Sequence, residues 1–198
     1  MTLSDKNDAM NPQRCEWPGN DQLMMTYHDV EWGVPLHDDP KLFEFMILDA
    51  MQAGLSWRTV LYKRAEFERA MHGFDVVKIS KYREKDVERL MGNAGIIRNR
   101  QKIEASITNA RAVLEVQREF GSLDAYLWQF VNGEPLNSKR KRTSPPTVTS
   151  KEAEVMSKAL KTRGFKFVGP TICYAFMQAA GFVNDHSTNC FRYAELTA

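Results

Sequence analysis

The chain has 198 residues, of which 43% are hydrophobic and 26% charged, as in ordinary globular proteins. Its formal net charge of +2 permits nucleic acid as a partner without arguing for it. No apolar run approaches membrane-spanning length, and the polar stretch 1–11 lacks the apolar core of a secretory signal. We therefore expect a cytoplasmic protein with no membrane partner.

Helical periodicity runs through most of the chain. Apolar side chains recur three and four positions apart, and glycines follow several of these segments, as expected at helix ends. Alternating strand patterns are scarce, and the sequence therefore predicts an all-α fold. The first five predicted helical segments lie within 42–53, 60–71, 86–92, 103–114 and 123–131.

Residues 134–148 interrupt this periodicity. They contain three prolines and the basic run 139–142, with the sequence Lys-Arg-Lys-Arg. A solvated loop is the plainer interpretation, and contact with a DNA backbone is the alternative. Sequence alone leaves both interpretations open.

Two further helices are predicted after this break. Thr149 followed by Glu152 has the pattern of a capping box, which would open a helix that stops near Gly164. Pro170 is allowed in the first turn of a helix, and the apolar pattern after it continues to Gly181.

The three cysteines are Cys15, Cys173 and Cys190. An odd number argues against a disulfide framework and favours a reducing compartment.

Cys15 and His28 are separated by twelve residues, and His186 and Cys190 by three. Two thiolates and two imidazoles form the donor set of a structural zinc site, which would tie the two chain ends together. The spacing alone equally allows buried or hydrogen-bonded residues, and Cys173, within an apolar helical run, is predicted to be core.

The connection between the last two predicted helices contains a short apolar turn, Phe165–Gly169. Backbone N–H groups at a helix N-terminus attract phosphate oxygens, and Lys161, Arg163 and Lys166 add positive charge. The segment resembles a helix-hairpin-helix element, which grips the DNA backbone without reading sequence. Such hairpins usually carry a glycine where this chain has Phe167, and an ordinary helix connection is the alternative.

Asp49 follows Leu42, Phe45 and Met46 at helical spacing, so it lies on the face that the helix should bury. A buried carboxylate must find donors or positive charge, or its pKa rises. A hydrogen-bonded structural aspartate is one interpretation. The functional interpretation is a buried acceptor that faces a polar or cationic ligand.

A Gly54-Leu55 tip follows Asp49 and is predicted to expose an apolar side chain between two helices. Large aromatic residues are core residues by default, but a base that has been flipped out of DNA needs stacking faces and an acceptor at its edge. The aromatic residues near these motifs are Trp17, Tyr27, Trp32 and Trp57.

Several of these motifs, in this order, closely resemble the bacterial DNA-3-methyladenine glycosylases of type I. The resemblance runs from about Arg14 to Cys190, nearly the whole chain. The motifs that carry it are Cys15–Trp17, Tyr27–Pro35, Gln52–Trp57, Ala94–Arg98, Arg163–Gly169 and Asn184–His186.

The resemblance implies a helix-hairpin-helix glycosylase fold, with a disordered extension at 1–13 and a single domain of two helical lobes at 14–198. It implies a monomer that acts on damaged double-stranded DNA and excises 3-methyladenine. One structural zinc ion would bind Cys15, His28, His186 and Cys190. By the same resemblance, Trp17, Tyr27, Asp49 and Trp57 would bind the base, and Gly54, Leu55, Lys166 and Gly169 would bind DNA.

Asp49 is also the expected catalytic residue, as an acceptor that favours positive charge on the base. The family usually has Glu at this position, and it has Tyr where this chain has Met24. These departures keep open a non-catalytic or altered-specificity DNA-binding homologue, and a zinc-stabilised interaction module is a third hypothesis. No catalytic aspartate of the kind found in other helix-hairpin-helix glycosylases is assigned, although Asp185 lies where it would be sought.

Overall fold

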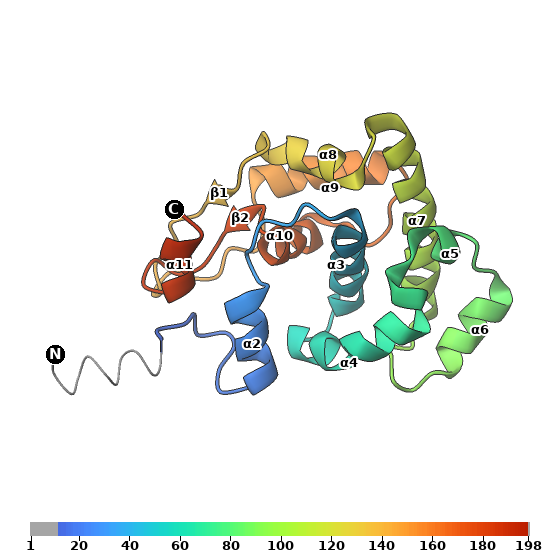
Figure 1. Ribbon diagram of the computed structural model, residues 1–198, viewed down its shortest axis with the longest axis horizontal. Coiled ribbons are helices and arrows are strands. Elements are labelled where there is room, and N and C mark those ends of the chain that lie inside the picture. Colours follow the sequence, from blue (N-terminus) through green and yellow to red (C-terminus); the bar gives the residue numbers. More distant parts are fainter. Residues whose placement is uncertain (1–11, 198) are drawn as a thin grey trace, which may run out of the picture.

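Helices make up most of the structure, a computed structural model that describes residues 12–197 (Figure 1). None of the helices in this range combines the length and apolar character that a membrane crossing requires. The helices are α2 (Gln22–Val30), α3 (Asp39–Gln52), α4 (Trp57–Ala70), α5 (Val76–Ser80), α6 (Glu84–Gly92), α7 (Arg100–Phe120), α8 (Leu123–Trp128), α9 (Lys151–Thr162), α10 (Pro170–Ala179) and α11 (Phe191–Glu195), with short 3₁₀ turns at His72–Phe74 and Gln129–Val131.

The core surrounds α3, in which every residue from Leu42 to Met51 is buried. Helices α4, α7, α8 and α10 pack against it, so α3 is enclosed by helices from both halves of the chain (Figure 1). The predicted extension 1–13 lies outside the described residues except for its last two. There the Gln13 carbonyl accepts a hydrogen bond from Phe191 N at 2.9 Å.

The predicted helices form, but the predicted cap of α9 is wrong by one residue. The Ser150 hydroxyl, and not that of Thr149, accepts the hydrogen bond from Ala153 N, at 3.2 Å. The Thr149 hydroxyl is buried and has no partner within the described chain. Two adjacent hydroxyl residues compete for the cap, and the sequence pattern alone cannot choose between them.

The all-α prediction also missed a small parallel pairing between β1 (Leu136–Asn137) and β2 (Val183–Asn184). Two residues are too short to show an alternating pattern. The pairing fixes the break after α8 beside the chain that follows α10. Just before β2, Gly181 lets the chain pass close to the segment that precedes α3: its φ is +74°, and a Cβ there would lie 2.3 Å from the Val34 carbonyl carbon.

A buried ion-pair network fixes α2 and α4 against α3. Arg64 Nε donates to Glu44 at 2.7 Å, and Arg64 Nη1 donates to Glu31 at 2.7 Å. Burial acts to lower the pKa of Arg64, but hydrogen bonds and charge from Glu44 and Glu31 outweigh it and raise that pKa. Glu44 is buried and Arg64 is largely so, whereas the Glu31 side chain is 38% exposed, so the pairing compensates the buried charges and defines the relative positions of these helices.

Lys102 holds the end of α3 in a similar way. This buried side chain donates to the carbonyls of Met51 and Ala53 at 2.9 and 2.6 Å. Both carbonyls belong to the end of the helix, where backbone acceptors lack helical partners and the dipole favours a cation. Lys102 therefore positions the turn between α3 and α4.

Candidate functional site

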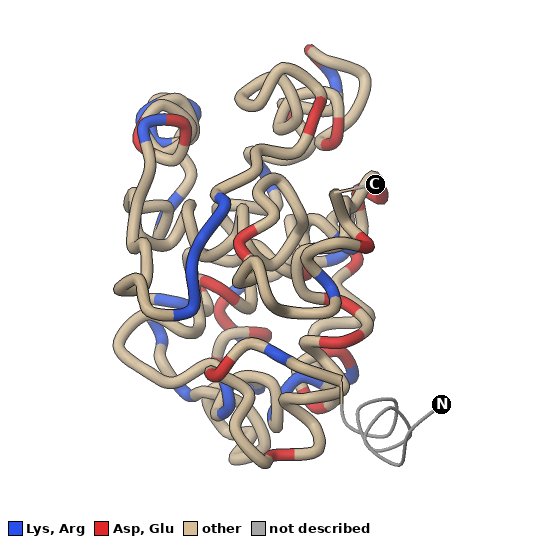
Figure 2. The backbone as a smooth tube through the Cα atoms, turned by 90° about the vertical axis from the view of Figure 1, so that its left-hand side faces the viewer, with Lys and Arg blue, Asp and Glu red and all other residues tan. Residues whose placement is uncertain are grey.

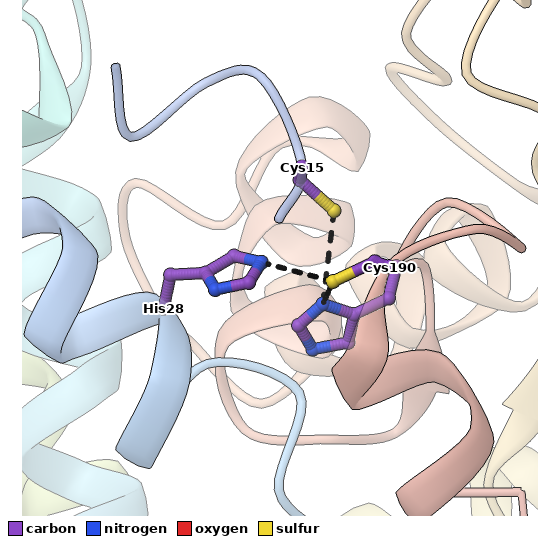
Figure 3. Close-up of side chains that lie close together, drawn as sticks. Cys15, His28 and Cys190 are labelled. Carbon is purple, nitrogen blue, oxygen red and sulfur yellow. Dashed lines mark hydrogen bonds between the residues drawn. The ribbon is translucent and has the colours of Figure 1, made fainter. Parts of the chain in front are cut away.

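Cys15, His28, His186 and Cys190 lie together, as the family resemblance implied. Cys190 Sγ is 3.5 Å from His28 Nε2 and 3.6 Å from His186 Nδ1, and Cys15 Sγ is 3.7 Å from the same His186 nitrogen (Figure 3). The four ligand atoms lie within 4.8 Å of one another, and all four residues are buried. Bonds of about 2.0–2.3 Å in a tetrahedral site give ligand separations of about 3.3–3.8 Å. The cluster could therefore hold a metal ion.

The second nitrogen of each imidazole has its own partner. His28 Nδ1 lies 2.8 Å from an Asp29 carboxylate oxygen, which also accepts from Arg14. His186 Nε2 lies 3.1 Å from the Trp32 carbonyl oxygen. Because these oxygens only accept, both nitrogens must donate, and the other nitrogen of each ring presents its lone pair to the cluster. Metal-binding histidines are commonly oriented in this way.

Adjacent to this cluster is a cavity of about 560 Å³. One wall is aromatic: the Tyr27 and Trp57 ring centroids are 5.2 Å apart, and those of Trp17 and Trp32 are 5.1 Å apart. The predicted base-binding residues Trp17, Tyr27, Asp49 and Trp57 all line this cavity. The other polar residues that line it include Glu16, Gln52, Arg140, Arg142, Gln178 and Asp185.

Three buried polar atoms of the cavity residues have no hydrogen-bond partner within residues 12–197: Asp49 Oδ2, Trp57 Nε1 and Asp185 Oδ1. The other Asp185 oxygen accepts from Gln178 Nε2 at 2.6 Å. Burial raises the pKa of Asp49 well above its ordinary value, and burial, with a contribution from Asp49, also raises that of Tyr27. Unpartnered buried polar groups are costly, so their concentration in one cavity indicates a polar ligand.

The Gly54-Leu55 tip has the predicted exposure. Gly54 has a φ of +77°, and Leu55 is 43% exposed although it follows the most buried helix of the protein. The Leu55 N–H donates to the Gln52 carbonyl at 2.6 Å, which closes the turn tightly. Neither residue of the tip lines the cavity, whereas Gln52 and Trp57 on either side of it do. The tip therefore lies next to the cavity.

In the turn between α9 and α10, Phe167 adopts a backbone conformation that is usual for glycine and unusual for phenylalanine. Phe167 adopts a φ of +54°, a region that favours glycine. Asn109 on α7 holds this turn, because its side chain accepts from Lys166 N at 2.7 Å and donates to the Lys166 carbonyl at 3.0 Å. The N–H groups of Val168 and Gly169 have no acceptor in the described part of the chain.

Three other residues singled out in the sequence have mixed outcomes. Cys173 is core as predicted, and burial raises its pKa to about 12. Arg163, expected to add charge to the α9–α10 turn, instead forms a two-pronged ion pair with Glu119 at 2.7 and 2.8 Å. Met24 is buried but does not line the cavity.

Sequence reasoning did not assign several cavity residues. The sequence assigns no role to Asp185, and it favours a solvated loop for the run that contains Arg140 and Arg142. Only its prolines and charge were visible in the sequence, whereas the β1–β2 pairing that places it at the cavity is too short to predict. Gln178 lies on α10, and a single glutamine in a helical pattern carries no recognisable signal.

A family model described as methyladenine glycosylase matches residues 17–193. The chain belongs to this family. It is 49% identical over 181 residues to DNA-3-methyladenine glycosylase 1 of Escherichia coli K12, covering 91% of this chain and 97% of the relative. Its identity to DNA-3-methyladenine glycosylase of Haemophilus influenzae Rd is 46% over 178 residues, covering 89% and 96%.

Solved structures agree with this membership of the methyladenine glycosylase family. A crystal structure of a 3-methyladenine DNA glycosylase I superposes with a TM-score of 0.88 at 50% identity, covering 90% of this chain and 98% of that one. A tyrosine-to-phenylalanine variant of such an enzyme, in complex with 3-methyladenine, gives a TM-score of 0.87 at 34% identity, covering 90% and 96%. The family resemblance stated from the sequence is thus confirmed.

Proposed function

We propose that this protein is a DNA glycosylase that flips 3-methyladenine out of alkylated double-stranded DNA and hydrolyses its N-glycosyl bond. The observation that carries the proposal is the aromatic cavity with the unpartnered Asp49 Oδ2 in its wall. Family membership supports it, because relatives that match almost end to end bear this activity in their names and a related structure contains 3-methyladenine.

The chemistry needs little help from an acid. Methylation at N3 gives the base a formal positive charge in the nucleotide, so the base departs neutral and the glycosidic bond is weak. Tyr27 and Trp57 would provide stacking faces in a cavity that excludes water, and water would then attack C1′ of a sugar with cationic character. Recognition of the lesion therefore accounts for most of the catalysis required.

Asp49 would act as the acceptor for the adenine edge. Its Oδ2 is buried without a donor, and burial raises the pKa of the carboxyl. A cationic base in contact would lower that pKa again and favour the carboxylate. Asp is one methylene shorter than the Glu usual in the family, so the base would sit deeper or contact Asp49 through a water molecule.

DNA itself would be held by two exposed turns. We propose that Leu55 fills the space that the flipped nucleotide vacates. We also propose that the α9–α10 turn is a helix-hairpin-helix element in which Lys166 and the free N–H groups near Gly169 bind the backbone. The left-handed Phe167 supports this interpretation, because the backbone there keeps the conformation that a glycine would adopt.

We propose that the cluster of Cys15, His28, His186 and Cys190 binds one structural zinc ion. The buried donor set, its separations and the oriented imidazoles support this assignment, and a bound zinc would hold the chain ends together without entering the reaction. We further propose that 14–198 forms one domain of two helical lobes, active as a monomer. The continuous hydrophobic core supports a single domain.

The decisive experiment is a base-release assay on methylated DNA, with Asp49→Glu tested beside the native protein. We expect release of 3-methyladenine by both proteins, with different rates because the acceptor is displaced by about one bond length. DNA binding without base release by the native protein would instead favour a non-catalytic homologue, the alternative suggested by Asp49 and Met24. Restoration of release in Asp49→Glu would then trace the loss to Asp49.

A further inference from the structure

The basic run 139–142 places four cations at the cavity, and only two of them have an acidic partner. It appears in Figure 2 as the longest continuous blue stretch of the chain. Lys139 and Lys141 are exposed and have no acidic partner in the described chain. Many other surface cations, by contrast, pair with a nearby acid, for example Arg118 with Glu115 at 2.6 Å. Within the run, Lys139 and Lys141 therefore present free positive charge, whereas Arg140 lies 4.0 Å from Asp185 and Arg142 pairs with Glu16.

The run is also held in place. The Arg140 carbonyl accepts from Thr188 N at 2.9 Å, and Arg140 Nε donates to the Asp185 carbonyl at 3.1 Å. Immediately before the run, Ser138 N donates to the Asn184 carbonyl at 3.2 Å. These bonds fix the backbone of the run along the edge of the cavity, where Arg140 and Arg142 are lining residues. A solvated loop would not need such anchoring.

Arg142 is the cation with an exchangeable partner. Its Nε donates to Glu16 at 2.7 Å, and both residues line the cavity with side chains 48% and 65% exposed. Ion pairs this exposed contribute little and are easily replaced. A DNA phosphate offers a guanidinium the same bidentate contact as a carboxylate. Neighbouring phosphates add their negative charge to it, so a DNA strand attracts Arg142 more strongly than the single Glu16 carboxylate does.

We propose that Arg142 exchanges Glu16 for a phosphate of the strand that carries the damaged base, with Lys139 and Lys141 on neighbouring phosphates. The inference rests on the proposed function. When the base enters the cavity, the phosphates on either side of its nucleotide remain at the edge, where the basic run lies. Glu16 then acts as a competitor that occupies Arg142 until DNA arrives.

This exchange predicts opposite effects for the two partners of one ion pair. Arg142→Gln removes the phosphate contact and should weaken binding to a duplex with a stable abasic-site analogue by roughly three- to tenfold, with the salt slope reduced by about one. Glu16→Gln frees Arg142 and removes repulsion, so it should strengthen binding by roughly two- to fivefold. Lys139→Gln and Lys141→Gln should each weaken binding and reduce the salt slope.

Two control variants, Arg118→Gln and Glu115→Gln, make the same charge changes in an exposed ion pair on α7. This pair lies on the opposite side of the molecule from β1 in Figure 1, so these variants should change the affinity for DNA much less than Arg142→Gln and Glu16→Gln do. Metal content should stay native in all variants, and binding of free 3-methyladenine should stay native in Lys139→Gln and Lys141→Gln, because these two lysines do not line the cavity. Equal-sign effects of Arg142→Gln and Glu16→Gln, or no effect beyond the α7 pair, would overturn the proposal. The base-release assay is independent: native protein that releases no base but shows the opposite-sign effects would refute the glycosylase activity and support the phosphate contact.

Discussion

Two buried polar regions lie side by side, and they differ in how their polar atoms are satisfied. In the cysteine and histidine cluster, the outward nitrogens of both imidazoles bond to Asp29 and to the Trp32 carbonyl. In the cavity, Asp49 Oδ2 and Trp57 Nε1 have no partner within residues 12–197. The first region is organised to hold its own geometry. The cavity has buried polar atoms that are free to bind a ligand, and leaving them without partners lowers the stability of the fold.

Two tryptophans connect the regions. Trp17 lies 5.5 Å from His28 and Trp32 lies 4.5 Å from His186, ring centroid to ring centroid, and both tryptophans line the cavity. The coupling should therefore be one-sided. Damage to the cluster should disturb the cavity, whereas changes to the cavity acceptors should leave the cluster intact.

The largest expected effect is that of Cys190→Ala. Loss of one ligand should remove the metal and destabilise the fold by several kcal/mol, which for a chain of this size lowers Tm by about 10 °C or more. Metal analysis and thermal unfolding would measure both effects. Cys173→Ala is the matched control, a buried cysteine outside the cluster, and it should keep the metal. Native protein that contains no zinc when prepared without chelators would refute the metal assignment.

Asp49→Asn should impair the function of the cavity without affecting the metal content of the cluster. It removes the negative charge that favours a cationic base, so we expect base release about a hundredfold slower and weaker binding of free 3-methyladenine. Metal content should stay native. Equal rates and affinities in the two proteins would mean that Asp49 is structural and that other groups read the base.

The same variant should be more stable than native protein at neutral pH. Burial raises the pKa of Asp49 in the folded protein, so the folded state holds this proton more tightly than the unfolded state. That contribution to stability is present below the unfolded pKa of about 4 and is lost as the pH rises toward the folded pKa. The difference in the free energy of unfolding between Asp49→Asn and native protein should therefore grow from pH 4 to pH 7. A difference in the free energy of unfolding that stays constant from pH 4 to pH 7 would contradict this prediction.

The cluster and the aromatic wall were predictable from sequence because their residues lie in motifs of the family that the chain resembles. The spacing of the four ligands suggested the metal site but left it open, and the rings alone would have been taken as core. The seven predicted helices were found from the spacing of their apolar residues, but α2, α5 and α11 were not predicted. The burial of Asp49 followed from its place in an apolar stripe. The α9 cap was not predictable, since Thr149 and Ser150 are chemically alike and only packing chooses between them.

The polar wall of the cavity escaped prediction for a different physical reason. Arg140 and Arg142 reach the cavity only because Leu136–Asn137 pairs with Val183–Asn184 across nearly fifty residues of sequence. A two-residue parallel pairing is a tertiary contact with no local pattern. The sequence therefore does not show where this polar loop lies in the fold. Its charge alone made a solvated loop the plainer interpretation.

A smaller effect is expected at the Gly54-Leu55 tip, outside both regions. If Leu55 fills the vacated stack, Leu55→Ala should slow base release from duplex DNA by about tenfold, because part of the unstacking cost is no longer offset. Release from single-stranded DNA should change little. Val77→Ala, an exposed apolar residue on α5, is the control and should release base at the native rate. A native rate for Leu55→Ala on duplex DNA would remove the wedge assignment.

The smallest expected effect is that of Gly169→Ala in the α9–α10 turn. Gly169 has a φ of −64°, and a Cβ there would meet nothing within 4 Å, so the variant should fold and bind metal normally. The added methyl would nevertheless occupy the space through which a phosphate approaches the free N–H groups of Val168 and Gly169. We expect affinity for duplex DNA to fall about threefold, without dependence on flanking sequence. Gly92→Ala is the matched control, since its Cβ is equally unobstructed at the end of α6, and it should leave DNA affinity unchanged. Equal DNA affinities for the two folded variants would show that the backbone at Gly169 does not approach a phosphate, and the turn would then be an ordinary helix connection.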